Sequence, residues 1–182
     1  MMMDESSKQA ALTLAREALR THFGLIKAAP PMPTAAIFQE QRGVFVTLTM
    51  GGKLRGCIGD LEANKPLCRA ITELAVAAAT RDPRFPPLVA AELDQVDLEI
   101  SLLTPLQPVS HWHEIKLSQH GVMVENQGRR GLFLPQVATE TMWDLETFLR
   151  ILCSQKAGLP PDAYLDPKTK LFTFEAEVIK EN

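Results

Sequence analysis

The sequence predicts an α+β protein in which two similar halves follow one amphipathic N-terminal helix. β-rich, hairpin-like runs occur at 43–59 and again from 121, and each is followed by a helical stretch and then by a strand with alternating apolar residues. The two copies are offset by about 78 residues at the hairpins and about 76 at the closing strands, which favours duplication of one unit. We therefore expect one domain over 1–182, with halves at about 37–105 and 115–180.

Composition limits the functions that the chain can have. Of its 182 residues, 46% are apolar and 23% are charged, and the net charge is −3, so no overall positive field attracts nucleic acid. The longest unbroken apolar run, 74–79, is far shorter than the roughly 20 residues that cross a bilayer. The three cysteines, Cys57, Cys68 and Cys153, have neither zinc-site spacing nor an even number. We expect a cytoplasmic protein without metal or other cofactor that binds neither membranes nor nucleic acid.

The first elements are a helix and a stiff connector. Apolar residues recur every three or four positions from Leu12 to Phe23, which predicts an amphipathic helix over 7–23. Three prolines follow within 28–34, where they prevent a helix and supply no backbone donors for a sheet. This segment therefore connects the helix to the β structure.

Residues 43–59 predict a β-hairpin whose turn is formed around two glycines. A turn with an even number of residues would place Arg55 and Cys57 on the apolar face and bury an unpaired guanidinium. A three-residue turn at 51–53 places them instead on the polar face together with Thr47. We therefore expect the three-residue turn.

A helix, a loop and a strand complete the first half. The segment 64–80 has a proline near its start and apolar residues at helical spacing, which predicts a second helix. The run RDPRFPPL at 81–88 contains too many prolines for a helix or a strand and predicts a stiff loop. In VDLEISLL at 96–103 apolar and polar residues alternate, as in a strand with one buried face.

The second half repeats this order. After its hairpin, the segment 139–156 predicts a helix that ends at Gly158. LFTFEAEVI at 171–179 alternates as VDLEISLL does, and Glu175 occupies the position that corresponds to Glu99. We expect a strand at the end of each half.

Four long motifs occur in the order found in one known family. They are LRGCIG at 54–59, RDPRFPPL at 81–88, EISLLTP at 99–105 and a stretch from GLFLPQ to KAGLP at 131–160. With the rest of the chain they resemble the AMMECR domain family, in particular its members in the AmmeMemoRadiSam system. The resemblance implies two β/α repeats that share one strongly curved, barrel-like and mainly antiparallel sheet, with a cleft near LRGCIG. It also implies an association with a Memo-like protein and a radical S-adenosylmethionine enzyme, but no settled molecular activity.

Cys57 is the first candidate for chemistry. It stands two residues from Arg55, so on one strand both side chains project from the same face with Cα atoms about 7 Å apart. A neighbouring cation stabilises a thiolate, which is the form that a nucleophilic cysteine requires. Spacing alone favours the alternative, a small apolar side chain packed in a strand. The resemblance, whose LRGCIG motif contains Cys57, favours the reactive role.

Five other residues are candidates for binding or proton transfer. If its strand lies beside the hairpin, Glu99 orients Arg55 or acts as a base; otherwise it belongs to a solvated sheet face. The stiff loop carries charged residues that either contact an anionic substrate group or pair with one another. Gln136 offers a donor and an acceptor to a polar substrate, or else caps a helix. The charged loop residues are Arg81, Asp82 and Arg84.

The sequence supports two main hypotheses. The first is a small thiol-dependent enzyme that acts with a Memo-like protein and a radical S-adenosylmethionine enzyme, with Cys57 as reactive centre and Arg55 as thiolate stabiliser. The alternative is a non-catalytic adaptor or peptide-binding module, because no complete triad, phosphate loop or metal signature is present. His111 and His113 alone have a spacing that suits a shared metal, without a matching carboxylate or thiol. A third hypothesis is that the radical enzyme modifies this chain.

Overall fold

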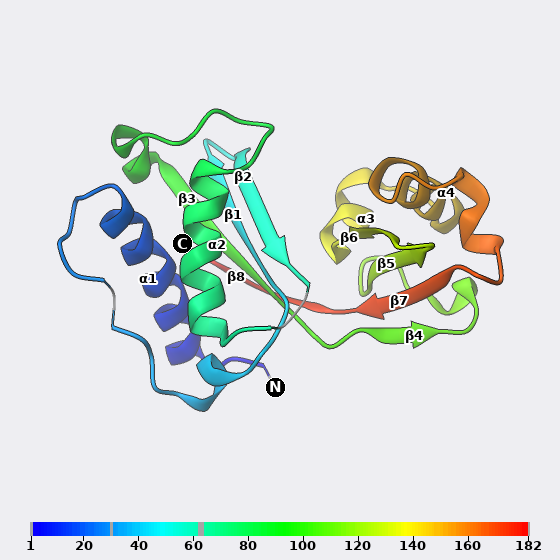
Figure 1. The fold of residues 1–182 in the computed structure, drawn as a ribbon, viewed down its shortest axis with the longest axis horizontal. Helices are drawn as coiled ribbons and strands as arrows, with labels where there is room; N and C mark the ends of the chain where they lie inside the picture. The colour runs from blue at the N-terminus through cyan, green and yellow to red at the C-terminus, as the bar shows by residue number, and fades with distance from the viewer. Residues whose placement is uncertain (1, 30, 62–63, 182) are drawn as a thin grey trace. The chain divides into compact units, whose positions relative to one another are not determined.

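The chain forms two compact units, each built around one four-stranded sheet (Figure 1). This computed structural model describes residues 2–29, 31–61 and 64–181. Unit 1 consists of Met1–Leu103 and Glu177–Asn182, and unit 2 consists of Thr104–Ala176. The last strand of the chain therefore belongs with the N-terminal unit.

The sheet of unit 1 has the strand order β2-β1-β3-β8. Its strands are β1 (Val44–Met50), β2 (Lys53–Asp60), β3 (Val96–Leu103) and β8 (Ala176–Lys180). β1 pairs antiparallel with both β2 and β3, so Thr47 stands opposite Cys57 on one side and opposite Glu99 on the other. The strand that carries Glu99 is thus separated from Cys57 by a single strand.

Two helices pack against this sheet. α1 (Glu5–His22) begins at Asp4, whose carboxylate accepts the backbone N–H of Ser7 at 2.7 Å. α2 (Leu67–Thr80) packs on β1 and β2, and α1 packs on α2 and β3. Two short 3-10 helices, η1 (Ala36–Gln39) and η2 (Ala90–Gln95), complete the unit. The core that they enclose includes Val46, Leu48, Leu98, Ile100 and Ile71.

The turn of the β1–β2 hairpin differs from the expected one. Met50 pairs with Lys53, so the turn has two residues, Gly51 and Gly52. Both have positive φ, 57° and 74°, a conformation that glycine adopts without strain. The prediction of a three-residue turn was therefore wrong.

A β-bulge restores the expected register beyond the turn. The pairing shifts after Leu48, which stands opposite Gly56, and Arg55 is left as the extra residue of β2. The additional residue thus lies in the strand and not in the turn. Beyond the bulge Thr47 and Cys57 face each other on the polar side, as the alternation predicts.

The sheet of unit 2 has the strand order β4-β7-β5-β6. Its strands are β4 (Gln107–Val109), β5 (Gly121–Asn126), β6 (Arg129–Phe133) and β7 (Lys170–Phe174). Its helices are α3 (Pro135–Thr141), α4 (Leu145–Ile151), a π-helical turn (Leu152–Lys156) that continues α4, and the 3-10 helices η3 (Trp112–Glu114) and η5 (Pro161–Leu165). A second core, centred on residues such as Val122, Phe148 and Leu152, lies within this unit.

The single helix expected over 139–156 is broken in the structure. Met142 ends α3 in the left-handed conformation, with φ 55°. Asp144 then caps α4, because its carboxylate accepts the backbone N–H of Thr147 at 2.8 Å. Two short helices therefore replace the predicted long one.

The two sheets have the same arrangement with an exchanged fourth strand. Starting from the hairpin edge, the order is β2-β1-β3-β8 in unit 1 and β6-β5-β7-β4 in unit 2. β4 follows β3 along the chain but lies in the sheet of unit 2, and β8 follows β7 but lies in the sheet of unit 1 (Figure 1). The strand expected over 171–179 is accordingly interrupted at Glu175.

The α+β class, the antiparallel pairing and the N-terminal helix are confirmed. Within the described residues the strands form two four-stranded sheets, so the single barrel-like sheet that we expected is not confirmed. The described part of the chain holds no helix with the length and apolar character needed to cross a membrane.

Candidate functional site

A row of polar side chains crosses the face of the unit 1 sheet that points away from α1 and α2. Each strand contributes one residue: β2 Cys57, β1 Thr47, β3 Glu99 and β8 Lys180. The hydroxyl of Thr47 donates to Sγ of Cys57 at 3.2 Å, and Nζ of Lys180 lies 2.8 Å from a carboxylate oxygen of Glu99. Cys57 and Glu99 are half-buried. A thiol, a hydroxyl and a carboxylate thus lie on three neighbouring strands.

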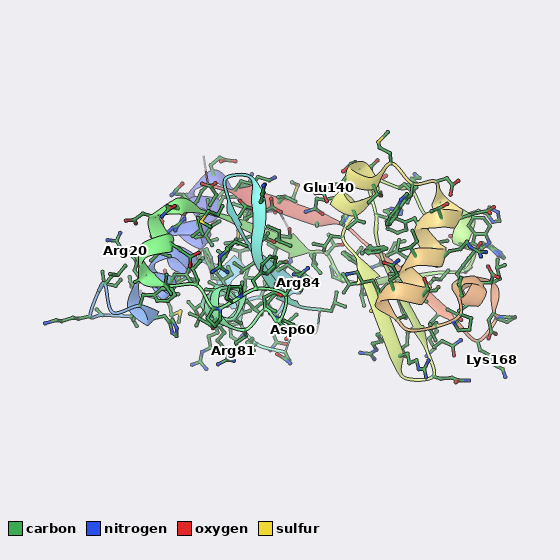
Figure 2. The ribbon with its side chains drawn as sticks, turned by 90° about the horizontal axis from the view of Figure 1, so that it is seen from above. Arg20, Asp60, Arg81, Arg84, Glu140 and Lys168 are labelled. Atoms are coloured by element: carbon green, nitrogen blue, oxygen red, sulfur yellow. The ribbon has the colours of Figure 1, made fainter. Side chains whose placement is uncertain are left out.

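The loop at 81–88 brings a buried carboxylate and an exposed cation to Cys57. Asp82 is 5% exposed, and its Oδ2 accepts the backbone N–H of Cys57 at 2.9 Å. Arg84 donates to the same carboxylate from Nε (2.9 Å) and from Nη2 (2.7 Å). Nη2 also lies 3.4 Å from the carbonyl oxygen of Cys57, while half of the Arg84 side chain remains exposed (Figure 2). The loop therefore fastens to the edge strand β2 and holds a guanidinium beside it.

These contacts set the protonation states of Asp82 and Cys57. The hydrogen bonds from Arg84, helped by the backbone N–H of Cys57, hold the pKa of the Asp82 carboxyl well below its usual range. Burial raises the pKa of the Cys57 thiol, and this effect exceeds the lowering by the Thr47 hydrogen bond and by the charge of Arg84. The thiol is therefore protonated at neutral pH.

Arg55 has a different partner from the one that the sequence suggested. Its Nε and Nη2 donate to the two carboxylate oxygens of Glu92 at 3.1 and 3.0 Å, and its Nη1 donates to the carbonyl oxygen of Pro86 at 2.8 Å. Glu92 also accepts the backbone N–H of Val89. These bonds tie the bulge in β2 to η2 and to the proline-rich loop. The cation that acts on the thiol is Arg84, and not Arg55.

The two glycines that flank Cys57 serve packing. A Cβ atom on Gly56 would lie 2.1 Å from the carbonyl oxygen of Ala78, so the glycine permits α2 to approach β2. A Cβ atom on Gly59 would lie 2.1 Å from the ring of Phe45, which stands opposite it on β1. The glycines of LRGCIG thus accommodate a helix backbone and an aromatic ring.

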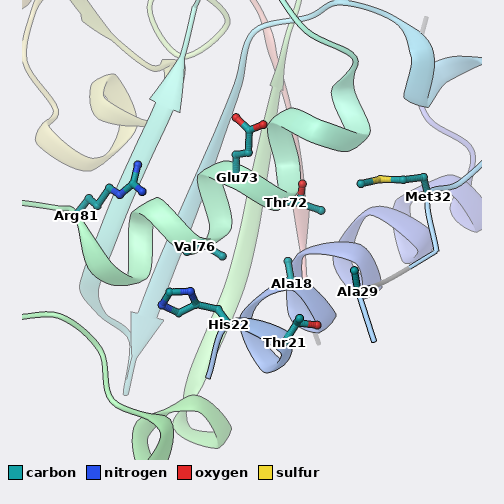
Figure 3. A pocket seen from close by; sticks show the side chains of 9 residues that line it. All are labelled: Ala18, Thr21, His22, Ala29, Met32, Thr72, Glu73, Val76 and Arg81. Atoms are coloured by element: carbon teal, nitrogen blue, oxygen red, sulfur yellow. The ribbon is translucent and has the colours of Figure 1, made fainter. Parts of the chain in front are cut away.

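Two of the predicted binding residues lie elsewhere. Arg81 lines a hollow of about 550 Å³ between α1 and α2, and this hollow does not include Cys57 (Figure 3). Gln136 lies in the first turn of α3 in unit 2, whereas every contact of Cys57 described above comes from unit 1. The structure thus brings together Cys57, Glu99, Asp82 and Arg84. Arg55 lies in the bulge of the same strand, β2, and binds Glu92. The cleft implied near LRGCIG stays a prediction.

The described residues contain no group of three or more histidine, cysteine, aspartate or glutamate side chains that could hold a metal ion. The ring of His113 is instead stacked on Trp112, with centroids 3.6 Å apart. Cys68 and Cys153 are buried in the cores of units 1 and 2.

Sequence reasoning did not select three residues of this region. Thr47 was placed on the correct face by alternation but was not proposed as a contact of the thiol. Glu92 lies in η2, a short 3-10 helix without a periodic signal. Lys180 reaches Glu99 only because β8 joins the unit 1 sheet, and this adjacency depends on the exchange of strands.

Fold and site together define the class: an α+β protein of two sheet-and-helix units, with a half-buried cysteine held on an edge strand by an aspartate–arginine loop. The chain belongs to the AMMECR1 family, whose model matches residues 12–179.

Similar proteins occur in archaea. A protein of Methanothermobacter thermautotrophicus is 46% identical over 93% of this chain and 91% of its own length. Protein MJ0810 of Methanocaldococcus jannaschii is 45% identical over 80% of this chain and 76% of its own length. The crystal structure of the uncharacterised protein PH0010 from Pyrococcus horikoshii is similar with a TM-score of 0.90 and 36% identity, covering 99% of this chain and 94% of that one.

Proposed function

We propose that the Cys57 site recognises a carboxylate group on a segment of a partner protein, and that the protein is a non-catalytic adaptor or peptide-binding module. One observation carries this proposal. An exposed guanidinium, that of Arg84, is held by a buried carboxylate directly beside a thiol that is protonated at neutral pH.

The arrangement suits recognition of an anion. Asp82 binds Arg84 through two of its nitrogens and thereby orients the guanidinium before a ligand arrives, which lowers the entropy lost on binding. Among the residues that the structure describes, none accepts a hydrogen bond from Nη1 of Arg84, so this nitrogen can donate to a carboxylate. A neutral thiol does not repel that carboxylate, whereas a thiolate would.

Family membership suggests which partners to test. We propose a Memo-like protein and a radical S-adenosylmethionine enzyme as the proteins that present the carboxylate, in the cytoplasm. A three-cysteine chain without disulfides suits such a reducing setting.

The test uses a probe and two variants. N-Acetylglycine carries one carboxylate and one peptide group, and its titration against ¹⁵N-labelled protein is expected to shift the amide signals of Cys57 and Arg84. R84Q should abolish these shifts, and C57S, which is nearly isosteric, should retain them. Binding of the Memo-like protein or the radical enzyme should likewise be lost in R84Q and retained in C57S. Equal binding by R84Q and the unmodified protein would refute the proposal.

A second function, thiol-dependent catalysis, is favoured by the alignment of Cys57, Thr47 and Glu99. In such a step the Thr47 hydroxyl, which donates to Sγ in this structure, turns its own proton to Glu99 and accepts the proton of the thiol. Sγ of Cys57 then bonds to a carbonyl carbon, and the π electron pair of the carbonyl moves to its oxygen. Lys180 supports this role because its ion pair with Glu99 fixes the position of that side chain.

The variants E99Q and C57S separate the two functions. If the protein is an enzyme, both variants should keep partner binding but lose turnover. If it is an adaptor, both variants should bind the partner as the unmodified protein does, and no turnover should be found in any of the three. T47V, which removes only the hydroxyl of the proposed path, should slow an enzyme by about 10² to 10⁴, the usual contribution of proton transfer.

A further inference from the structure

We propose that the hollow between α1 and α2 binds a small amphiphile with one anionic head, held by Arg81 and His22, and a short apolar tail. This site is separate from that of Cys57. The loop at 81–88 divides its charged residues between the two places: Asp82 and Arg84 contact Cys57, and Arg81 lines the hollow.

The hollow has the size of a ligand site. Its volume is about 550 Å³, within the range of roughly 300 to 1,000 Å³ that is usual for small-molecule pockets. Residues of unit 1 form its walls: the last turns of α1, the middle of α2 with Arg81 at its end, and the two residues Ala29 and Met32 (Figure 3).

Most of the wall is apolar. Ala18 of α1 and Val76 of α2 face the hollow, and Met32 of the connector lies against it with 47% of its surface exposed. A flexible thioether at this position adapts its shape to an incoming alkyl chain. Burial of such apolar surface supplies the main attraction for a tail, at roughly 25 cal/mol per Å².

The polar groups of the wall differ in whether they are already engaged. Glu73 forms an ion pair with Lys65. The hydroxyl of Thr21 donates to the carbonyl oxygen of Ala28 at 3.1 Å, and the hydroxyl of Thr72 donates to the backbone carbonyl oxygen of Arg69 at 2.9 Å. These groups have protein partners and do not require a ligand.

Arg81 is the exception among the charged groups of the wall. Its guanidinium forms neither a hydrogen bond nor an ion pair with any residue that the structure describes, and the residue is exposed. His22 lies in the last turn of α1, and its ring meets that of Phe23 edge-on. Because the carboxylate of Glu73 is paired with Lys65, Arg81 is the charged group of the wall that is left to meet a ligand. This charge selects an anionic head.

The test compares ligands that differ only in the head. Octanoate and octyl phosphate carry anionic heads, whereas octanol and octylammonium carry a neutral and a cationic head on the same tail. Calorimetric titration should give binding by at least one anionic probe, about tenfold tighter than by octanol or octylammonium. The tighter of the two anionic probes identifies the head as a carboxylate or a phosphate.

Variants locate the head. R81Q should weaken binding of the anionic probe about tenfold, R81K should retain most of it, and H22Q should weaken it severalfold. The matched control is R20Q. Arg20 is an exposed cation in the same turn of α1 as His22, but it does not line the hollow. Should R81Q fail to fold, V76E places a negative charge in the wall and should weaken binding to a similar extent.

Amide shifts on titration should map to the C-terminal half of α1 and to α2. Equal affinity for octanol and octanoate, unchanged affinity of both R81Q and V76E, or shifts confined to the surroundings of Cys57 would each overturn the proposal. The last outcome would assign the anion to Arg84 and so leave the proposed function intact.

Discussion

The carboxylate of Asp82 accepts the backbone N–H of Cys57 at 2.9 Å and thereby occupies the outer edge of β2. An edge strand presents unpaired backbone groups that are prone to pairing with other chains. Here a side chain from a proline-rich loop takes the place of a strand at that point, and Arg84 approaches the neighbouring carbonyl oxygen. The same contacts thus protect the edge and build the candidate site.

The substitution D82N should destabilise unit 1 by about 2 to 3 kcal/mol, because a buried acceptor loses its charge while Arg84 and Cys57 lose a charge-assisted partner. Both tryptophans lie in unit 2, so the measurement is native-state hydrogen exchange of the β1 and β2 amides. D97N, which changes an exposed aspartate on β3, is the control and should stay within about 0.5 kcal/mol. Equal effects of the two variants would contradict a structural role of Asp82.

Acid should weaken unit 1 through the same carboxylate. The pKa of Asp82 is lower in the folded than in the unfolded chain, so its contribution is complete above the unfolded value, near pH 4, and declines as the pH falls below it toward the folded pKa. Stability of unit 1 should therefore decrease on acidification below about pH 4. In D82N this decrease should be smaller, and an identical pH profile for both proteins would show that Asp82 is not its source.

Alkylation of Cys57 by iodoacetamide should be slow at neutral pH, because burial raises the pKa of the thiol. Mass spectrometry of the modified peptide gives the rate as a function of pH. R84Q should move the profile to higher pH, since the charge of Arg84 lowers the thiol pKa. R55Q removes a guanidinium that is engaged by Glu92 and should leave the profile unchanged. A shift in R55Q without one in R84Q would restore the role that the sequence suggested for Arg55.

The substitutions G56A and G59A should both destabilise unit 1, by different mechanisms. An added methyl at Gly56 meets the backbone of α2, which cannot yield, so we expect a loss of at least about 2 kcal/mol. At Gly59 the obstacle is the ring of Phe45, and F45A should relieve it. A double-mutant cycle should therefore show favourable coupling for G59A with F45A and none for G56A with F45A.

Local patterns predicted the elements of unit 1 well. The strand over 96–103 was predicted with its observed bounds, and the helices over 7–23 and 64–80 were predicted to within about three residues. Alternation placed Thr47 and Cys57 on one face, although the extra residue lies in a bulge at Arg55. A three-residue turn and a two-residue turn followed by a bulge give the same register from Gly56 onward. The pattern of apolar residues therefore does not distinguish the two.

The partners of the charged residues were not predictable in this way. Spacing along β2 suggested that Arg55 would act on Cys57, but Arg55 donates two hydrogen bonds to Glu92 of η2, and no sequence pattern brings these two segments together. Pairing of Asp82 with an arginine of its loop was one of two alternatives that the sequence left open, whereas the attachment of Asp82 and Arg84 to Cys57 depends on the path of the loop. In the second half, the helix break at Met142 depends on a left-handed residue that local propensity disfavours.

The exchanged fourth strands have a consequence for synthesis of the chain. Unit 1 obtains β8 only after residues 104–175, which separate β3 from β8, have been synthesised, and Arg16 of α1 must then pair with Glu181. Contacts that span 165 residues close slowly, because the loop entropy is lost before the contact is gained. Until that moment the outer edge of β3 stays open. A nascent chain arrested before residue 176 is therefore expected to need a chaperone to avoid aggregation.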